Sequence, residues 1–93
     1  MNSFSGDERA KAQMLRKLAR KRKWEHSHTA YDDMIKAVPK HERGAAKRAA
    51  EDLIRQGLIR IKPAFYGKQV SLNHERCDEI NAIIRRYFGK NAI

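Results

Sequence analysis

The sequence holds a single cysteine, Cys77, so no disulfide can form within the chain. A lone thiol is typical of proteins from reducing compartments, and we expect a cytoplasmic protein. No apolar run approaches the ~20 residues that a membrane-spanning helix requires, so we expect no membrane insertion. The start of the chain, MNSFSGDERA, also lacks the basic and then apolar order of a secretory signal peptide.

Motifs for catalysis and metal binding are lacking as well. The sequence has no Gly-rich phosphate loop, nucleophile elbow or pair of catalytic carboxylates, so we do not expect an enzyme. His74 and Cys77 lie three residues apart, but no CxxC or HxxxH unit accompanies them, and Cys77 falls on an apolar stripe. We therefore predict no metal site and no cofactor, and we interpret Cys77 as a small core residue.

Acidic residues are few compared with basic ones. The 93 residues include 21 Lys and Arg but 11 Asp and Glu, which gives a formal net charge of +10. Such a surface attracts polyanions, so nucleic acid is the first partner to consider and an anionic membrane surface is the second. The length suffices for one domain and is too short for two. We predict a single domain over residues 1–93, with its core at about residues 7–89.

Two helices are predicted in the first part of the chain, from apolar residues at helical spacing. Ser5 and Glu8 form a capping box, and the helix that they begin should continue to about Lys23. Thr29 is predicted to cap the second helix. That helix should end before Pro39, because the residue before a proline avoids helical dihedrals.

A third helix is predicted over residues 42–56, after a short turn at residues 39–41. Gly57 follows where a left-handed helix end is needed. Residues 58–62 and 68–73 then alternate between apolar and polar, and the turn-forming residues 63–67 separate them, which predicts a β-hairpin. One face of the hairpin should be buried, formed by Ile59, Ile61, Val70 and Leu72.

A last helix is predicted between a cap at Asn73 and an end at Gly89. Its apolar stripe is wider than a cap on a small core requires. We therefore predict a homodimer that forms through the first and last helices, which would place two third helices about one DNA turn apart. The alternative is that the same side chains pack within one subunit. The predicted dimer residues are Met14, Leu18, Ile83, Ile84, Tyr87 and Phe88.

The predicted order is helix, helix, helix, hairpin, helix, which is a mainly α fold with a small β-hairpin (α+β). Within it, the short core side chains of the third helix and the segment LIRQGLIRIK resemble the winged helix-turn-helix superfamily, and look like its small prokaryotic regulators. The resemblance implies that the hairpin is the wing and that the chain is a DNA-binding transcriptional regulator. The residues that carry it are Ala46, Ala49, Ala50, Leu53, Gly57, Leu58, Ile59, Gln69, Val70, Ser71, Leu72 and Asn73.

In winged-helix DNA-binding proteins the third helix enters the major groove of double-stranded DNA. By resemblance, its groove-facing residues here would be Arg43, Gly44, Ala45, Lys47, Arg48 and Glu51. A helical wheel also exposes most of these, together with Lys40, His41 and Arg55. Arg48 is the strongest candidate for a base contact, because a guanidinium can bridge O6 and N7 of guanine. The hairpin would add contacts to the backbone or minor groove from Arg60, Lys62, Tyr66, Lys68 and Gln69.

Several alternatives stay open at this stage. Glu51 could accept a hydrogen bond from cytosine, although an ion pair with Arg48 or Arg55 is the interpretation that we favour. The basic block at residues 16–23 could contact flanking backbone or RNA, or form a solvated face. An RNA-binding, ribosome-associated winged helix would use the aromatic platforms Trp24, Phe65 and Tyr66. A protein-interaction module would instead dock its third helix on an acidic partner.

Overall fold

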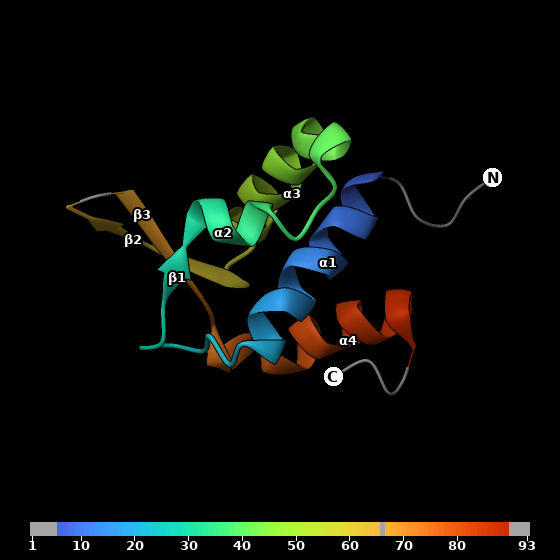
Figure 1. Ribbon diagram of the computed structural model, residues 1–93. Helices are drawn as coiled ribbons and strands as arrows, with labels where there is room; N and C mark the ends of the chain where they lie inside the picture. The colour runs from blue at the N-terminus through green and yellow to red at the C-terminus, as the bar shows by residue number, and fades with distance from the viewer. Residues whose placement is uncertain (1–5, 66, 90–93) are drawn as a thin grey trace.

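The computed structural model describes residues 6–65 and 67–89, so the predicted cap at Ser5 and the predicted contact at Tyr66 lie outside the described residues. The described part is mainly helical with a small antiparallel sheet, which confirms the predicted α+β class (Figure 1). Short 3-10 turns at Lys40–Glu42 and His74–Arg76 precede α3 and α4. The elements are α1 (Gly6–Arg20), β1 (Thr29–Ala30), α2 (Tyr31–Ile35), α3 (Arg43–Arg55), β2 (Ile59–Ala64), β3 (Gly67–Leu72) and α4 (Cys77–Phe88).

The sheet has the strand order β1-β3-β2, with both pairings antiparallel. The hairpin register pairs Ile59 with Leu72 and Ala64 with Gly67, and β1 pairs Thr29 with Val70 on the other side of β3. In Figure 1 the hairpin formed by β2 and β3 extends away from the helices. Pro63 and Ala64, which we predicted in the loop, belong to β2.

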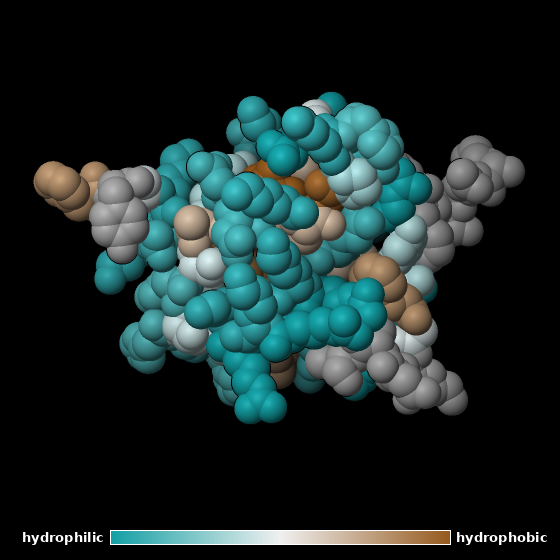
Figure 2. Space-filling view, viewed as in Figure 1, coloured by the Kyte–Doolittle hydropathy of each residue, from teal (hydrophilic) through white to brown (hydrophobic). Residues whose placement is uncertain are grey.

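The hydrophobic core forms around α1, which packs against α2, α3 and α4. Met14, Leu15 and Leu18 of α1 are fully buried. The helix α3 turns its short side chains, Ala46, Ala49 and Ala50, into the same core. Hydrophilic side chains cover most of the face seen in Figure 2, and brown apolar side chains show in small areas between them, at the tip on the left and towards the right. None of the helices in the described ranges has the length and apolar character needed to cross a bilayer.

Three of the predicted dimer residues are core residues of the single chain. Met14, Leu18 and Ile84 have no exposed surface, so they cannot contribute to an interface without unfolding, and their assignment to a dimer surface is corrected. The other three, Ile83, Tyr87 and Phe88, are half-buried. The Tyr87 and Phe88 rings meet edge-on at 4.9 Å between centroids.

The segment after α1 differs from the predicted one, because it joins the sheet. The helix ends at Arg20 instead of Lys23, and Arg22 has a φ of 56°. The backbone N–H of Leu72 donates to the carbonyl of Lys23 at 2.7 Å, and the N–H of Glu25 donates to the carbonyl of Leu72 at 2.9 Å. This pairing with β3 competes with the last turn of the helix and explains the earlier end.

Thr29 is a strand residue and not the cap of α2. The residue at the cap position is Ala30, whose side chain makes no capping hydrogen bond, and the Thr29 hydroxyl donates to Asp33 at 3.2 Å. The structure also corrects the buried hairpin face in part: Ile59 is buried, but Ile61 is 38% exposed. Because β2 is an edge strand, one flank of Ile61 stays open to solvent.

Candidate nucleic-acid interface

A pocket of about 330 Å³ lies where α3, the start of α2 and the hairpin meet. Lys47 lines it from α3, and Lys68 lines it from β3. Tyr31 and Asp32 contribute the wall at the start of α2. The structure thus brings Lys47 of the predicted recognition helix and two residues of the predicted wing, Lys68 and Gln69, to a single cavity.

Tyr31 orients the hairpin cation in this pocket. The Lys68 ammonium lies 5.5 Å from the centroid of the Tyr31 ring, within the range of a cation–π contact. Partial burial of Tyr31 raises the pKa of its hydroxyl, and the nearby carboxylates Glu51 and Asp32 raise it further. The phenol therefore keeps its proton at neutral pH, and the ring stays uncharged beside the two lysines.

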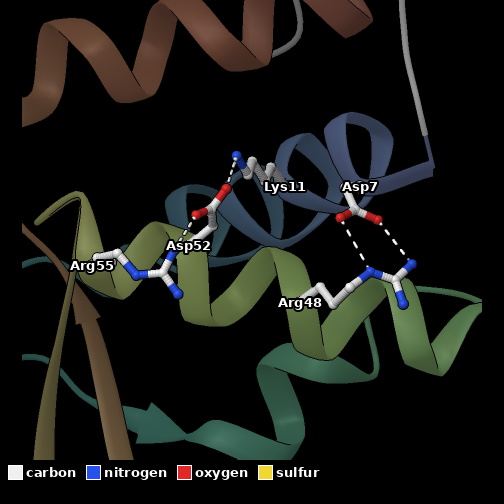
Figure 3. Close-up of polar contacts among 5 residues, drawn as sticks. All are labelled: Asp7, Lys11, Arg48, Asp52 and Arg55. Carbon is white, nitrogen blue, oxygen red and sulfur yellow. Dashed lines mark hydrogen bonds and ion pairs between the residues drawn. The ribbon is translucent and has the colours of Figure 1, made fainter.

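The basic residues of α3 differ in how far they are neutralised within the chain. Lys47 is exposed, as the helical wheel predicted. Arg43, which the wheel put near the core edge and only the resemblance put in the groove, is exposed as well. Arg48 is also exposed, but its guanidinium donates two hydrogen bonds to Asp7 of α1 (Figure 3). The hydrogen bonds to Asp7 raise the pKa of Arg48, so it stays charged. The strongest candidate for a base contact is thus held by a carboxylate of its own chain.

A second ion-pair cluster holds the C-terminal half of α3 against α1. Asp52 accepts a hydrogen bond from the Lys11 ammonium at 2.7 Å and another from Arg55 at 2.9 Å (Figure 3). The bond from Lys11 lowers the pKa of Asp52. The preferred ion-pair interpretation of Glu51 is wrong, because Arg48 pairs with Asp7 and Arg55 pairs with Asp52.

The N-terminal end of α3 carries the remaining predicted residues of this helix. Lys40 and His41 lie in the 3-10 turn before it, and both are exposed. The imidazole of His41 lies 3.4 Å from the carboxylate of Glu42, which also binds Arg9. Gly44 is exposed, whereas Ala45 is half-buried and has little surface to offer a ligand.

The hairpin residues divide between its two faces. Because side chains alternate along a strand, Lys68 lies on the same face as Val70, whereas Arg60, Lys62 and Gln69 lie on the other face. Arg60 donates to the side chain of Asn73 at 3.0 Å and lies 3.4 Å from Glu25. The predicted wing therefore presents one cation, Lys68, on the face towards α3. Its other two cations, Arg60 and Lys62, lie on the opposite face.

The aromatic platforms named for RNA binding differ in exposure. Phe65, at the hairpin tip, is fully exposed. Trp24 is partly buried against the core and meets His74 edge-on at 6.0 Å between ring centroids. Of these two aromatic residues, only Phe65 offers a free face for stacking.

No three His, Cys, Asp or Glu side chains in the described ranges come together in a way that could hold a metal ion. Cys77 is half-buried at the start of α4, so its assignment to the core is corrected. Its Sγ lies 3.9 Å from Oδ1 of the Asp78 carboxylate, to which the thiol donates.

Two residues of this region carry no signal in the sequence. Asp7 is read from the sequence as an ordinary acidic residue in a first helical turn, and its partner Arg48 lies 41 positions away. Tyr31 is read as a core residue of the second helix, because its position over Lys68 depends on the sheet. Comparison of the chain with protein-family models, curated proteins and solved structures finds no match.

Proposed function

We propose that this chain is a winged helix-turn-helix protein that binds double-stranded DNA, with α3 in the major groove and the hairpin against the backbone. The element order and the strand order β1-β3-β2, with the hairpin beside α3, support this assignment. The net charge of +10 supports a polyanionic partner.

The observation that carries the proposal is the pocket shared by Lys47 and Lys68. Two lysines from different elements line one cavity together with one carboxylate, Asp32, so the lining keeps a net positive charge that favours an anion. A backbone phosphate supplies that charge, and it would position the helix and the hairpin on one duplex. Lys40, Arg43 and Arg55 would contact further phosphates along α3.

Arg48 is the residue that we assign to base recognition. Its guanidinium would exchange the Asp7 carboxylate for O6 and N7 of guanine, which present two acceptors to the same pair of N–H groups. Transcriptional control would then follow from occlusion or recruitment at a promoter. A homodimer stays a prediction, restricted to the half-buried residues Ile83, Tyr87 and Phe88.

The test is an equilibrium titration of the protein against random duplex DNA, single-stranded DNA and structured RNA, each at two salt concentrations. We expect duplex DNA to bind most tightly and to weaken steeply with salt, because binding releases counterions. Lys47→Ala and Lys68→Ala should each reduce the log–log salt slope by about 0.9. Lys36→Ala, at an exposed lysine outside the pocket, is the matched control and should leave the slope unchanged.

A slope near zero for the unmodified protein, or equal effects of the three substitutions, would overturn the proposal. A preference for RNA would favour the second candidate, an RNA-binding winged helix, which the free face of Phe65 supports. Phe65→Ala should then weaken RNA binding more than duplex binding.

A further inference from the structure

Glu51 lies near the middle of the exposed face of α3. At about 100° per residue, it falls between Lys47 and Arg48 around the helix axis, roughly 40° from the first and 60° from the second. The buried side chains of this helix lie on the core side: Ala46, Ala49, Ala50 and Leu53. Glu51 itself is exposed. When a helix enters a groove, a side chain at the middle of its exposed face meets the base edges, and its neighbours on either side meet the phosphates.

The Glu51 carboxylate has no cation bound to it in the described part of the chain, where no hydrogen bond or ion pair joins it to another residue. Arg48 and Arg55 lie three and four positions away, which are the spacings at which helix residues pair. Both arginines are already bound to other carboxylates (Figure 3). Arg48 binds Asp7, and Arg55 binds Asp52. Glu51 is therefore a charged acceptor whose oxygen atoms are available to a ligand.

The same carboxylate lies beside the pocket that we propose for a backbone phosphate. Burial raises the pKa of the Tyr31 hydroxyl, and the negative charge of Glu51 raises it further, so the two side chains are close. Tyr31 lines the pocket together with Lys47 and Lys68. A negative charge at this place repels phosphates. It therefore weakens binding to every duplex that offers the carboxylate no hydrogen-bond donor in return.

The four bases differ in what they present to a carboxylate in the major groove. Guanine presents the acceptors N7 and O6, and thymine presents the acceptor O4. Adenine has an amino donor, but its acceptor N7 lies next to it. Cytosine presents the N4 amino group with no acceptor on the same base. Because an ionised carboxylate only accepts hydrogen bonds, cytosine is the base that fits Glu51 best.

We infer that Glu51 determines sequence specificity, by accepting a hydrogen bond from N4 of a cytosine in the major groove and by repelling duplexes that lack a cytosine there. The inference rests on the proposed function, which assigns base recognition to Arg48. The rise along α3 from Arg48 to Glu51 is about 4.5 Å, close to the step of about 3.4 Å between base pairs. The guanine bound by Arg48 and the cytosine bound by Glu51 therefore lie on neighbouring base pairs.

The experiment selects duplexes with the full chain from a library that has a randomised central segment. Affinity is then measured for the selected duplex, for versions of it changed at one base pair, and for random duplex. Glu51→Ala removes the carboxylate, and Glu51→Gln replaces it with an amide of similar size, both at an exposed position. Arg48→Ala removes the proposed guanine contact. Asp78→Asn removes a negative charge from an exposed position of α4 and is the matched control for net charge.

We expect the unmodified protein to prefer cytosine over thymine at one position by about fivefold or more. Glu51→Ala should reduce that preference to less than about twofold and should raise affinity for random duplex by about two- to fivefold at low salt. Glu51→Gln should shift the preference to adenine, because an amide can bind N6 and N7 together. Arg48→Ala and Asp78→Asn should each leave the cytosine preference intact.

A protein that binds duplex DNA without a cytosine preference, or with one that survives Glu51→Ala, overturns the inference and leaves the proposed function standing. If Glu51→Ala removes a preference for guanine instead, Glu51 acts by positioning Arg48, and the inference fails as well. A protein that binds no duplex, or that prefers structured RNA, overturns both the inference and the proposed function.

Discussion

Arg48 on α3 donates from Nη2 to Oδ1 of Asp7 at 3.1 Å and from Nε to Oδ2 of the same residue at 3.3 Å. The pair is largely exposed, so water and salt weaken it, and it adds little to stability. Its effect lies in competition, since the carboxylate occupies the two N–H groups that a guanine would need. Under the proposed function, the affinity of α3 for DNA would therefore depend on Asp7, a residue of α1 that does not touch the ligand.

Replacing Asp7 should strengthen duplex binding. Asp7→Asn removes the negative charge that holds Arg48, and this charge lies beside the helix that we propose to bind DNA. We expect duplex affinity to rise by about three- to tenfold at low salt, where surface electrostatics are least screened. Fluorescence anisotropy against a labelled duplex measures the change.

The control for that substitution is Asp78→Asn, which removes the same charge from the first turn of α4. It should raise affinity by less than about twofold, since it changes only the net charge. Combined with Arg48→Ala, Asp7→Asn should lose most of its effect. An equal gain from both Asn variants, or a gain that survives the loss of Arg48, would show that the ion pair does not compete with DNA.

Two glycines, one in the first turn of α3 and one just after its end, should respond to alanine in opposite ways. Gly57 has a φ of +79°, and an added Cβ would meet Arg76 at an ordinary 3.5 Å, so the cost of Gly57→Ala is backbone strain of about 1–2 kcal/mol. Gly44 lies in the first turn of α3, and an added Cβ would be 3.6 Å from Arg48. Gly44→Ala should stabilise by about 0.5 kcal/mol, because it restricts the unfolded chain.

Urea unfolding of the two variants and the unmodified protein shows, in one series, whether each substitution raises or lowers the free energy of unfolding. A midpoint that moves the same way in the two variants would contradict the assignment of Gly57 as the left-handed end of α3. The slope of the unfolding transition should stay constant, since neither substitution alters the surface that unfolding exposes.

Asn73 should be among the most costly polar side chains to remove. Its amide donates to the carbonyl of Gly57 at 2.8 Å, and its oxygen accepts from the N–H of Glu75 at 3.1 Å and from Arg60 at 3.0 Å. Only 9% of the residue is exposed. Asn73→Ala should lower the free energy of unfolding by about 1–3 kcal/mol, by removing a cap and leaving the Gly57 carbonyl without its partner.

Asn73→Asp separates the donor role of the Asn73 side chain from its acceptor role in the same unfolding assay. Aspartate keeps the acceptor for Glu75 and Arg60 but cannot donate to Gly57. The free energy of unfolding of Asn73→Asp should fall between those of the unmodified protein and Asn73→Ala. A loss equal to that of alanine would assign the whole effect to the bond with Gly57.

Stability should decline as the pH falls below about 5. The pKa of Asp52 is lowered chiefly by Lys11, that of Asp33 by Lys21, and that of Glu25 by the backbone N–H of His74. A carboxyl whose pKa is lower in the folded state stabilises the fold at neutral pH and loses that contribution on protonation. The loss begins about one pH unit above the unfolded pKa of about 4 and is complete below the folded pKa.

Thermal melts between pH 7 and pH 3 follow this loss, and Asp52→Asn isolates one carboxyl. That variant should melt lower than the unmodified protein at pH 7 and approach it at pH 3. Parallel curves over the whole range would show that the Lys11–Asp52 pair contributes nothing to the pH dependence. High salt should narrow the difference at pH 7, because the Asp52 carboxylate is partly exposed to solvent.

The sequence predicted the elements that depend on local pattern. Residues only a few positions apart in the sequence determine each of these features. They are the apolar period of α3, the glycine after it and the alternation along the hairpin. The strand β1 was missed because two residues are too few to show alternation, and it exists only through its pairing with Val70 and Gln69. The early end of α1 was missed for the same reason, since it depends on Leu72.

The candidate site was predicted only in part, because exposure and pairing are properties of the folded chain. A helical wheel separates Lys47 from the core without any knowledge of neighbours. It cannot show that Asp7 neutralises Arg48, that Tyr31 lies under Lys68, or that Met14 has no surface left for a partner. Each of these depends on a contact between elements distant in the sequence.

The sheet narrows from three strands to two before it reaches the hairpin tip. β1 pairs with β3 at Val70 and Gln69, so beyond Gln69 the backbone of each hairpin strand pairs only with the other strand. An unsupported two-stranded ribbon is only marginally stable in water, whereas α3 is fixed by the core. Lys68 therefore lies on the less supported part of the hairpin, whereas Lys47 lies on a helix fixed by the core. Under the proposed function, the distance between the two cations would adjust to the polyanion bound between them.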